Sequence, residues 1–293
     1  MKNSNKLIFV AVLLISFIAA DLLASFVMQP FFLRSGRFSL SDFEIVQRDH
    51  QEETWDKVFF GNSVVISCFR EDESNSGYIN LGLDYGVVTD LWEIIDKGYM
   101  NVGSDLVIGL NSLTLYDDFE TNPYYPWHRN WYEPYCYFER DRLSQLVNET
   151  LGQLAGQGVN YNFVGQQKAV YYGAMSVEEI LAHRSTEHYL PLLTLAKDDY
   201  KENFRALEKI CSYCSENDIR LRLVWLPINP IIEVDDASAC AYNMSKEFAK
   251  THNLEFFDMT GMMDADCYYD GGHLNYQYGS HVFTEVIDPW LNK

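Results

Sequence analysis

From residue 55 onward, short apolar runs alternate with longer segments whose apolar residues recur at helical spacing. The short runs predict strands, and the longer segments predict helices, because positions three or four residues apart share one helix face. The predicted strands span residues 57–60, 78–81, 105–110, 219–227 and 254–259. The predicted helices span residues 87–100, 202–217, 239–252 and 278–291. This alternation predicts an α/β fold, a three-layer α/β/α (flavodoxin-like) domain whose parallel sheet is covered on both faces.

One long segment, from about residue 112 to residue 195, contains no clear strand pattern and is interpreted as an insertion. Its first part, residues 115–138, is rich in tyrosine and tryptophan. An insertion that follows a strand end lies near the functional edge of a sheet, where aromatic rings could hold a sugar or an acyl chain. The same rings could instead pack a small core of the insertion's own, and the sequence leaves both interpretations open.

Residues 7–28 differ from the rest of the chain, because they form a run of 22 residues in which Asp21 is the one charge. As a helix this run is about 33 Å long, which matches a hydrocarbon core of about 30 Å. The run is longer than the apolar part of a signal peptide and lacks a good cleavage site. It therefore predicts an uncleaved transmembrane signal anchor, in which Asp21 either faces a partner helix or is a tolerated charge.

The predicted organisation is a flank of residues 1–6, the anchor, a connector of residues 29–54 and the α/β domain of residues 55–293. The basic residues on the two sides of the anchor are nearly balanced, so they favour an extracytoplasmic domain only slightly. We expect a single-pass protein of the cell membrane with its folded domain outside the cytoplasm.

The composition narrows the choice of partners. The formal net charge is −20, and so acidic a surface repels phosphate backbones, which argues against nucleic acid. Cys211 and Cys214 have the spacing of a redox motif, but they lie within a predicted helix that no strand precedes, as packing cysteines often do.

Four predicted strand ends carry chemically useful groups. Ser63 follows the first strand, Gly82 the second and Asn111 the third, while Asp270 and His273 follow the last. Ligands bind beyond the carboxyl ends of parallel strands, so we expect these residues to meet at one edge of the sheet.

The same residues are the parts of an acyl-transfer site. Ser63 would be the nucleophile, His273 the base that takes its proton, and Asp270 the acceptor that fixes the imidazole. A tetrahedral intermediate also needs preorganised donors for its oxyanion. The backbone N–H groups of Ser63 and Gly82 and the side-chain amide of Asn111 are the predicted donors.

This set of residues, in this order, resembles the SGNH (GDSL-type) hydrolase superfamily, which places Ser, Gly, Asn and His in four sequence blocks with an Asp three residues before the His. The resemblance covers about residues 55–291. Two positions depart from it, since Asn62 stands where the family usually has Asp, and Ser112 follows Asn111 where a second Asp is usual. An anchor before such a domain is similar to the envelope branch of the superfamily, with the D-alanyl transfer protein of teichoic acids and the O-acetyltransferases of alginate and peptidoglycan.

The resemblance implies a serine-dependent O-acyltransferase or esterase that acts on cell-envelope polysaccharide, or on an acylated small molecule, through an acyl-enzyme at Ser63. It also implies a membrane-bound acyltransferase as a possible partner, and no cofactor. The alternative is a non-catalytic protein that keeps the fold for glycan binding or envelope assembly.

Less specific interpretations exist for each site residue. Ser63 could cap a helix, Asn111 could be a turn residue, and His273 could precede a helix capped by Asn275. No metal site is expected, because the acidic run from Asp264 to Asp270 has Asn275 where a calcium loop needs glutamate.

Overall fold

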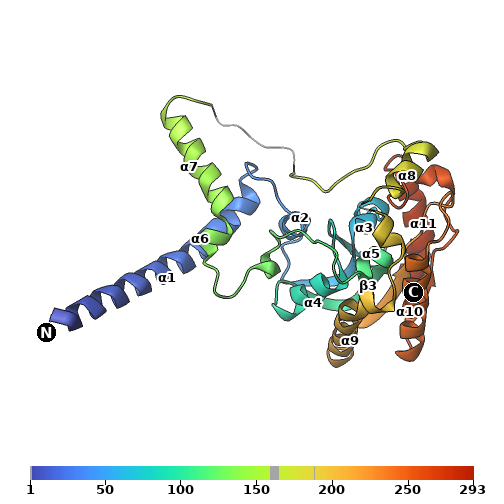
Figure 1. The fold of residues 1–293 in the computed structure, drawn as a ribbon, viewed down its shortest axis with the longest axis horizontal. Coiled ribbons are helices and arrows are strands. Elements are labelled where there is room, and N and C mark those ends of the chain that lie inside the picture. The colour runs from blue at the N-terminus through green and yellow to red at the C-terminus, as the bar shows by residue number, and fades with distance from the viewer. Residues whose placement is uncertain (1, 159–164, 188) are drawn as a thin grey trace. The chain divides into compact units, whose positions relative to one another are not determined.

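Five strands form one parallel sheet in the order β2-β1-β3-β4-β5 in the computed structural model, which describes residues 2–158, 165–187 and 189–293 (Figure 1). The strands are β1 (Thr54–Gly61), β2 (Ile79–Gly82), β3 (Asn101–Leu110), β4 (Arg220–Trp225) and β5 (Glu255–Asp258). This is the flavodoxin-like strand order, whose direction reverses between β1 and β3. The predicted α/β fold with a parallel sheet is therefore confirmed.

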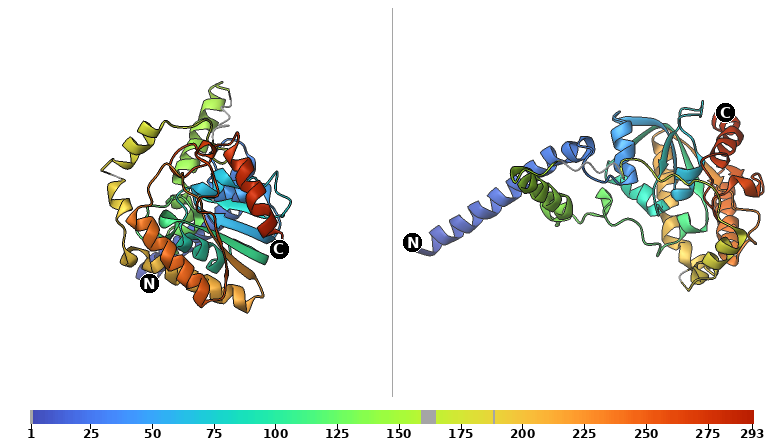
Figure 2. Two further views of the ribbon diagram at one scale, coloured as in Figure 1. Left: turned by 90° about the vertical axis from the view of Figure 1, so that its right-hand side faces the viewer. Right: turned by 90° about the horizontal axis from the view of Figure 1, so that it is seen from above.

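Helices cover both faces of the sheet (Figure 2). The helices that follow β1 and close the chain are α3 (Ser63–Cys68) and α11 (Gly279–Leu291). They pack on one face, where Val65, Phe283 and Ile287 are buried in the same apolar cluster as Phe59 and Val107 of the strands. Residues of β1 and β3 are buried on both faces, as is typical of a parallel sheet.

The other face carries α4 (Val88–Asp96), α9 (Lys201–Glu216) and α10 (Asp236–Thr251). Helix α4 packs against α9, and Phe204 of α9 contacts Phe248 of α10 with ring centroids 5.9 Å apart. The remaining helices are α1 (Lys2–Arg34), α2 (Asp42–Asp49), α5 (Ser112–Leu115), α6 (Tyr135–Phe138), α7 (Arg140–Leu154) and α8 (Val177–Arg184). Short 3₁₀ turns cover Pro126–His128, Leu190–Leu193, Lys197–Tyr200 and Ala265–Cys267.

The chain forms two compact units. The sheet unit consists of residues 50–122 and 168–293, and it contains every strand named above. The anchor unit consists of residues 1–49 and 123–167, and it contains α1, α2, α6 and α7. The segment predicted as one insertion, residues 112–195, is thus divided between the two units.

The anchor unit has a core of its own. Phe32 of α1, Phe38 and Tyr135 are buried together, and Leu143 and Leu146 of α7 pack against them. A buried Glu44 binds Arg142 through both carboxylate oxygens at 2.6 Å, which joins α2 to α7.

The aromatic stretch predicted at residues 115–138 is partly explained by this core. Trp127 is buried, lies stacked on Tyr125 with ring centroids 4.5 Å apart, and meets Phe43 of α2 edge-on at 5.0 Å. These rings therefore pack against one another and against α2 of the predicted connector, so the core that they join is not the insertion's own.

Helix α1 is longer than the predicted anchor of residues 7–28. In the part of the chain that the structure describes, one helix is both long enough and apolar enough to cross a membrane, namely Asn5–Arg34. The predicted connector of residues 29–54 holds the end of this helix and all of α2, because Phe43, Ile45 and Val46 give α2 an apolar face that is buried.

Candidate active site

Ser63 lies where β1 ends and α3 begins. The side-chain oxygen of Asn62 accepts a hydrogen bond from the N–H of Val64 at 3.0 Å, so Asn62 caps the helix and the hydroxyl of Ser63 is not needed for that purpose. A Cβ atom at Gly61 would come within 2.3 Å of the side chain of Val65, so the tight turn before Ser63 requires glycine.

The hydroxyl of Ser63 faces an imidazole. Ser63 Oγ lies 2.9 Å from Nε2 of His273, within the 2.6–3.2 Å that proton transfer between a nucleophile and its base requires. The two residues are 210 positions apart in the chain and meet because the segment after β5 returns to the carboxyl end of β1.

The second nitrogen of the imidazole faces a carboxylate. Nδ1 of His273 lies 2.8 Å from Oδ2 of Asp270, and Oδ1 of Asp270 accepts the N–H groups of Gly272 and His273, both at 2.8 Å. Burial raises the pKa of Asp270, but the hydrogen bond and charge of His273 and the two N–H donors outweigh it and hold the pKa below its ordinary value. Asp270 therefore stays ionised and fixes the imidazole with Nε2 toward Ser63.

The loop that carries this pair is fastened at two points. The side-chain amide of Asn229 donates to the backbone oxygen of Asp270 at 2.9 Å. On the other side, the hydroxyl of Ser67 accepts the N–H of Leu274 at 3.2 Å. Ser67 lies one turn after Ser63 in α3, so the helix that holds the hydroxyl also holds the loop of the imidazole.

A tyrosine covers the imidazole ring. Tyr171 stacks on His273 with ring centroids 4.3 Å apart and the ring planes 17° from parallel. The backbone around it is held in place, because the N–H of Tyr276 donates to the oxygen of Tyr171 at 2.8 Å. The stacked face leaves both ring nitrogens of His273 to Ser63 and Asp270.

Asn111 follows β3 and faces Asn62 across the point where the strand order reverses. Its Oδ1 accepts the N–H and the hydroxyl of Thr114 at 2.8 and 2.9 Å, and the amide of Asn62 at 3.1 Å. These three donors fix the orientation of the amide, so its nitrogen is the end that can still donate. That nitrogen makes one long contact of 3.4 Å with Asn62 Oδ1, which leaves a proton for another acceptor.

The structure differs from the prediction at Gly82. Its N–H donates to Oδ1 of Asn80 at 2.8 Å, so it is occupied and does not serve as an oxyanion donor in this arrangement. Gly82 has another function, since a Cβ atom there would come within 2.5 Å of the backbone nitrogen of Ile66. The glycine lets β2 approach α3 closely. The N–H of Ser63 has no hydrogen-bond partner among the described residues and is the backbone donor that is still available.

The sequence predictions for Ser63, Asn111, Asp270 and His273 thus concern residues that the structure brings to one edge of the sheet. Sequence reasoning missed Tyr171, Asn229 and Ser67, which hold or cover the predicted pair. No spacing could have found Tyr171, because it lies in a segment without a regular pattern. The one available signal was Ser67, which repeats the polar position of Ser63 a helix turn later.

A second row of nucleophile, imidazole and carboxylate lies between α9 and the end of α10. Sγ of Cys211 is 3.7 Å from Nδ1 of His252, and Nε2 of His252 is 3.1 Å from Glu208. Burial and the negative charge of Glu208 raise the pKa of the Cys211 thiol, which keeps it protonated. All six cysteines are free thiols.

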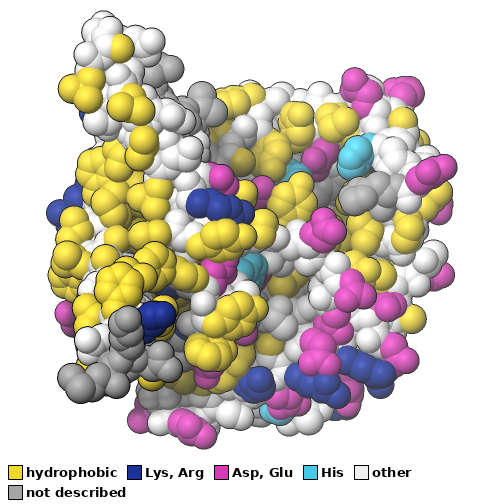
Figure 3. Space-filling model, turned by 60° about the vertical axis from the view of Figure 1, so that its left-hand side comes forward, with side chains coloured by type: hydrophobic (Ala, Val, Ile, Leu, Met, Phe, Trp, Pro, Cys, Tyr) yellow, Lys and Arg dark blue, Asp and Glu magenta, His cyan; other side chains and the backbone are white. Residues whose placement is uncertain are grey.

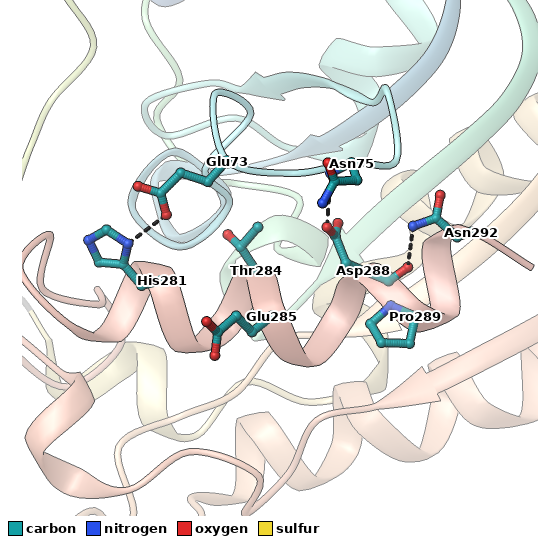
Figure 4. A pocket seen from close by; sticks show the side chains of 8 residues that line it. All are labelled: Glu73, Asn75, His281, Thr284, Glu285, Asp288, Pro289 and Asn292. Carbon is teal, nitrogen blue, oxygen red and sulfur yellow. Dashed lines mark hydrogen bonds and ion pairs between the residues drawn. The ribbon is translucent and has the colours of Figure 1, made fainter.

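A hollow of about 430 Å³ opens beside α11 (Figure 4). It is lined by Glu73, Asn75, His281, Thr284, Glu285, Asp288, Pro289 and Asn292. The polar groups in it already bind one another, for example His281 to Glu73 at 2.5 Å and Asn75 to Asp288 at 3.0 Å. The hollow contains none of the predicted site residues. Among the described residues, no group of three or more His, Cys, Asp or Glu side chains could hold a metal ion.

No protein-family model matches the chain, and no curated protein matches it. Among solved structures, the chain is similar to a carbohydrate acetylesterase from Sinorhizobium meliloti, with 12% sequence identity and a TM-score of 0.33 over 80% of this chain and 98% of that one. A likeness this distant carries no argument about function, which depends on the geometry of the site.

Proposed function

We propose that this chain is a membrane-anchored serine esterase or O-acyltransferase that acts on cell-envelope polysaccharide through an acyl-enzyme at Ser63. The observation that carries the proposal is the unbroken row of hydrogen bonds from Ser63 through His273 to Asp270, at 2.9 and 2.8 Å. Each atom in this row lies where general-base activation of a hydroxyl needs it.

In the first half of the reaction, Ser63 Oγ attacks the carbonyl carbon of an ester and His273 Nε2 takes the hydroxyl proton. Asp270 keeps its negative charge and stabilises the imidazolium through Nδ1–H. The carbonyl oxygen becomes an oxyanion, to which the N–H of Ser63 and the amide of Asn111 would donate. When the intermediate collapses, the ester C–O bond breaks, the leaving alcohol receives the proton from His273, and the acyl group remains on Ser63.

In the second half, an acceptor hydroxyl gives its proton to His273 and attacks the acyl-enzyme. The new ester or acid forms, the bond to Ser63 Oγ breaks, and the proton returns to Ser63. If the acceptor is water the enzyme is an esterase, and if it is a sugar hydroxyl the enzyme is a transferase. The atoms of the site serve both reactions equally.

The envelope glycan and the transfer reaction are the finer parts of the proposal. They are supported by the resemblance to the SGNH superfamily and by the apolar helix α1, which would keep the site at a membrane where a membrane-bound acyltransferase could supply the acyl group. The aromatic residues Tyr125 and Trp127 do not add support, because they are buried in the anchor unit. The support for transfer therefore comes from the tether and from the resemblance.

The first test is covalent labelling of the full-length protein with a fluorophosphonate, which reacts with activated serines. We expect labelling of the wild type at Ser63 and none of the Ser63→Ala variant. Ser104→Ala is the matched control, because Ser104 is an exposed serine near the opposite end of β3. Its labelling should equal that of the wild type. Labelling of Ser63→Ala at the wild-type level would place the nucleophile elsewhere, and an unlabelled but folded wild type would favour the non-catalytic glycan-binding alternative.

The second test separates transfer from hydrolysis. The full-length protein is incubated with an aryl acetate, with and without envelope oligosaccharides, and the products are analysed by mass spectrometry. We expect slow release of acid without oligosaccharide and acylated sugar when it is present. Rapid hydrolysis with no acylated sugar would leave an esterase.

A further inference from the structure

Asp21, the one charge within the apolar run, has a defined partner in the anchor unit. Its two carboxylate oxygens accept the N–H groups of Tyr135 and Cys136 at 2.8 and 2.9 Å, where α6 begins. The side chain is 9% exposed. A carboxylate in an apolar helix is costly unless donors satisfy it, and here two backbone donors from a segment 114 residues away do so.

The two faces of α1 differ from this residue onward. Residues 7–20 are exposed on all sides, as a helix surrounded by lipid would be. Beyond Asp21, one face packs against the rest of the anchor unit through Ala24, Met28 and Phe32. The opposite face stays apolar and exposed, and consists of Leu22, Leu23, Phe26 and Val27.

The exposed apolar surface of α1 therefore has a different length on each of the two faces. At 1.5 Å per residue, the uncovered face from residue 7 to residue 27 is about 31 Å long, which is enough for a hydrocarbon core of about 30 Å. The covered face from residue 7 to residue 20 is only about 21 Å long. A helix with one long and one short apolar face fits a bilayer when it is tilted, with its covered face toward the membrane surface.

Exposed aromatic residues lie just before and within the segment that covers this face. Trp131 is 93% exposed, and Tyr132 and Tyr137 are 68% and 57% exposed. Tryptophan and tyrosine are enriched at the membrane surface because an apolar ring and a polar group suit the headgroup region. Hydrophobic side chains also gather over the part of the surface formed by α1 and α7 (Figure 3).

We propose that α1 crosses the bilayer obliquely and that residues 131–138, fastened to Asp21, lie in the lipid headgroup region with Trp131 inserted among the lipids. The occupant of this surface is the bilayer itself, because the surface is continuous with the lipid-facing side of the anchor. Residues 129–142 carry three arginines and three carboxylates, so their charges cancel and the insertion requires no anionic lipid. This inference is independent of the chemistry at Ser63.

The test places the full-length protein in vesicles of phosphatidylcholine whose acyl chains carry bromine either close to the headgroup or close to the chain end. Bromine quenches tryptophan fluorescence on contact, so the difference between wild type and Trp131→Phe reports the depth of Trp131. We call this difference in fluorescence the Trp131 component. We expect bromines close to the headgroup to quench it more strongly than bromines close to the chain end. Trp92→Phe is the control, because Trp92 belongs to α4 of the sheet unit, and its removal should leave the quenched component unchanged.

Two outcomes would overturn the insertion. A Trp131 component that neither bromine position quenches would mean that water or a protein partner covers the residue. Stronger quenching by the deep bromines would place it in the hydrocarbon core. Replacing half of the lipid with phosphatidylglycerol should not change the result.

The fastening is tested with Asp21→Ala, which removes both acceptors, against Ser25→Ala one turn further along the same helix. We expect Asp21→Ala to stay in the membrane fraction and to lose the shallow quenching of Trp131, whereas Ser25→Ala keeps it. Unchanged quenching in Asp21→Ala would show that the carboxylate does not hold the segment. The Trp131→Phe comparison leaves the anchor intact and tests the insertion even if Asp21→Ala fails to fold.

Discussion

Two rows of nucleophile, imidazole and carboxylate lie in the same unit of this protein. One joins Ser63, His273 and Asp270, and the other joins Cys211, His252 and Glu208. In both rows an aromatic ring stacks on the imidazole, Tyr171 at 4.3 Å in the first and Phe248 at 4.2 Å in the second. On connectivity alone the two would be equivalent.

Their surroundings differ. Glu208 and Cys211 lie on one helix, and the side chain of Glu208 is 55% exposed, so water competes for the carboxylate. The side chain of Asp270 is only 25% exposed, and its oxygens accept two backbone N–H groups as well as the imidazole N–H. The contact between Cys211 and His252 is also long at 3.7 Å, and burial raises the pKa of the thiol.

The row at Ser63 is a candidate site because of its position at the edge of the sheet. There the N–H of Ser63 and the amide of Asn111 lie at the ends of adjacent parallel strands, where they can meet a developing oxyanion. Cys211 lies instead in the middle of α9, where the backbone N–H groups bond along the helix.

The largest expected difference between the rows comes from removal of the imidazoles. His273→Ala should lower kcat for an aryl ester about 10⁴-fold or more, because Ser63 loses its base. His252→Ala should leave the rate unchanged. A stopped or continuous absorbance assay measures kcat of both variants, and thermal unfolding checks that each variant is folded. Equal losses of kcat in the two variants would mean that the rows at Ser63 and Cys211 do not differ in function.

Removal of the amide that only the first row possesses should have the next largest effect. Asn111→Ala should lower kcat about 10²- to 10³-fold with little change in KM, because the amide would bind the oxyanion and not the ground state. Asn217→Ala, at the end of α9, is the control and should behave as the wild type. A change in KM alone would mean that Asn111 binds substrate and does not stabilise the intermediate.

Most of the fold follows from local patterns in the sequence, since each predicted strand overlaps an observed one. Ser63 and Asn111 could be predicted because each follows directly after a strand, and topology fixes where strand ends meet. Asp270 and His273 lie in the longer segment between β5 and α11, so their three-residue spacing was the signal that identified them. The occupied N–H of Gly82 could not be predicted, because the side chain of Asn80 reaches it two residues away through a rotamer that no pattern encodes. The division of the aromatic segment between two units depends on long-range packing, such as Trp127 on Phe43.

Removal of the aromatic rings that stack on the two imidazoles should have a smaller effect on the rate. Tyr171→Leu should lower kcat about two- to twelvefold, because an aromatic contact of this kind contributes about 0.5–1.5 kcal/mol. Tyr171→Phe should restore the rate, since the ring and not the hydroxyl makes the contact. Phe248→Leu, the corresponding change in the second row, should not affect the ester reaction. Loss of rate in Tyr171→Phe would assign the function to the hydroxyl.

The smallest expected effect concerns stability as a function of pH. The folded pKa of Asp270 lies below its unfolded value, so its contribution to the free energy of unfolding is present above about pH 4 and is lost as the pH falls through the folded pKa. Wild type should therefore be more stable than Asp270→Asn above about pH 5, with a difference that shrinks on further acidification. Denaturant unfolding at several pH values measures it. A difference that grows toward low pH would contradict the sign.

The contact between Ser67 and Leu274 has a consequence for motion. The Ser67 hydroxyl accepts the N–H of Leu274 and donates to the backbone oxygen of Val64. The loop that carries His273 is therefore hydrogen-bonded to the helix turn that carries Ser63. Helix and loop should therefore fluctuate as one body, and the separation between Ser63 Oγ and the imidazole should vary little while each of them moves. Hydrogen exchange would reveal this coupling, because the amide of Leu274 should exchange only when the helix turn itself opens.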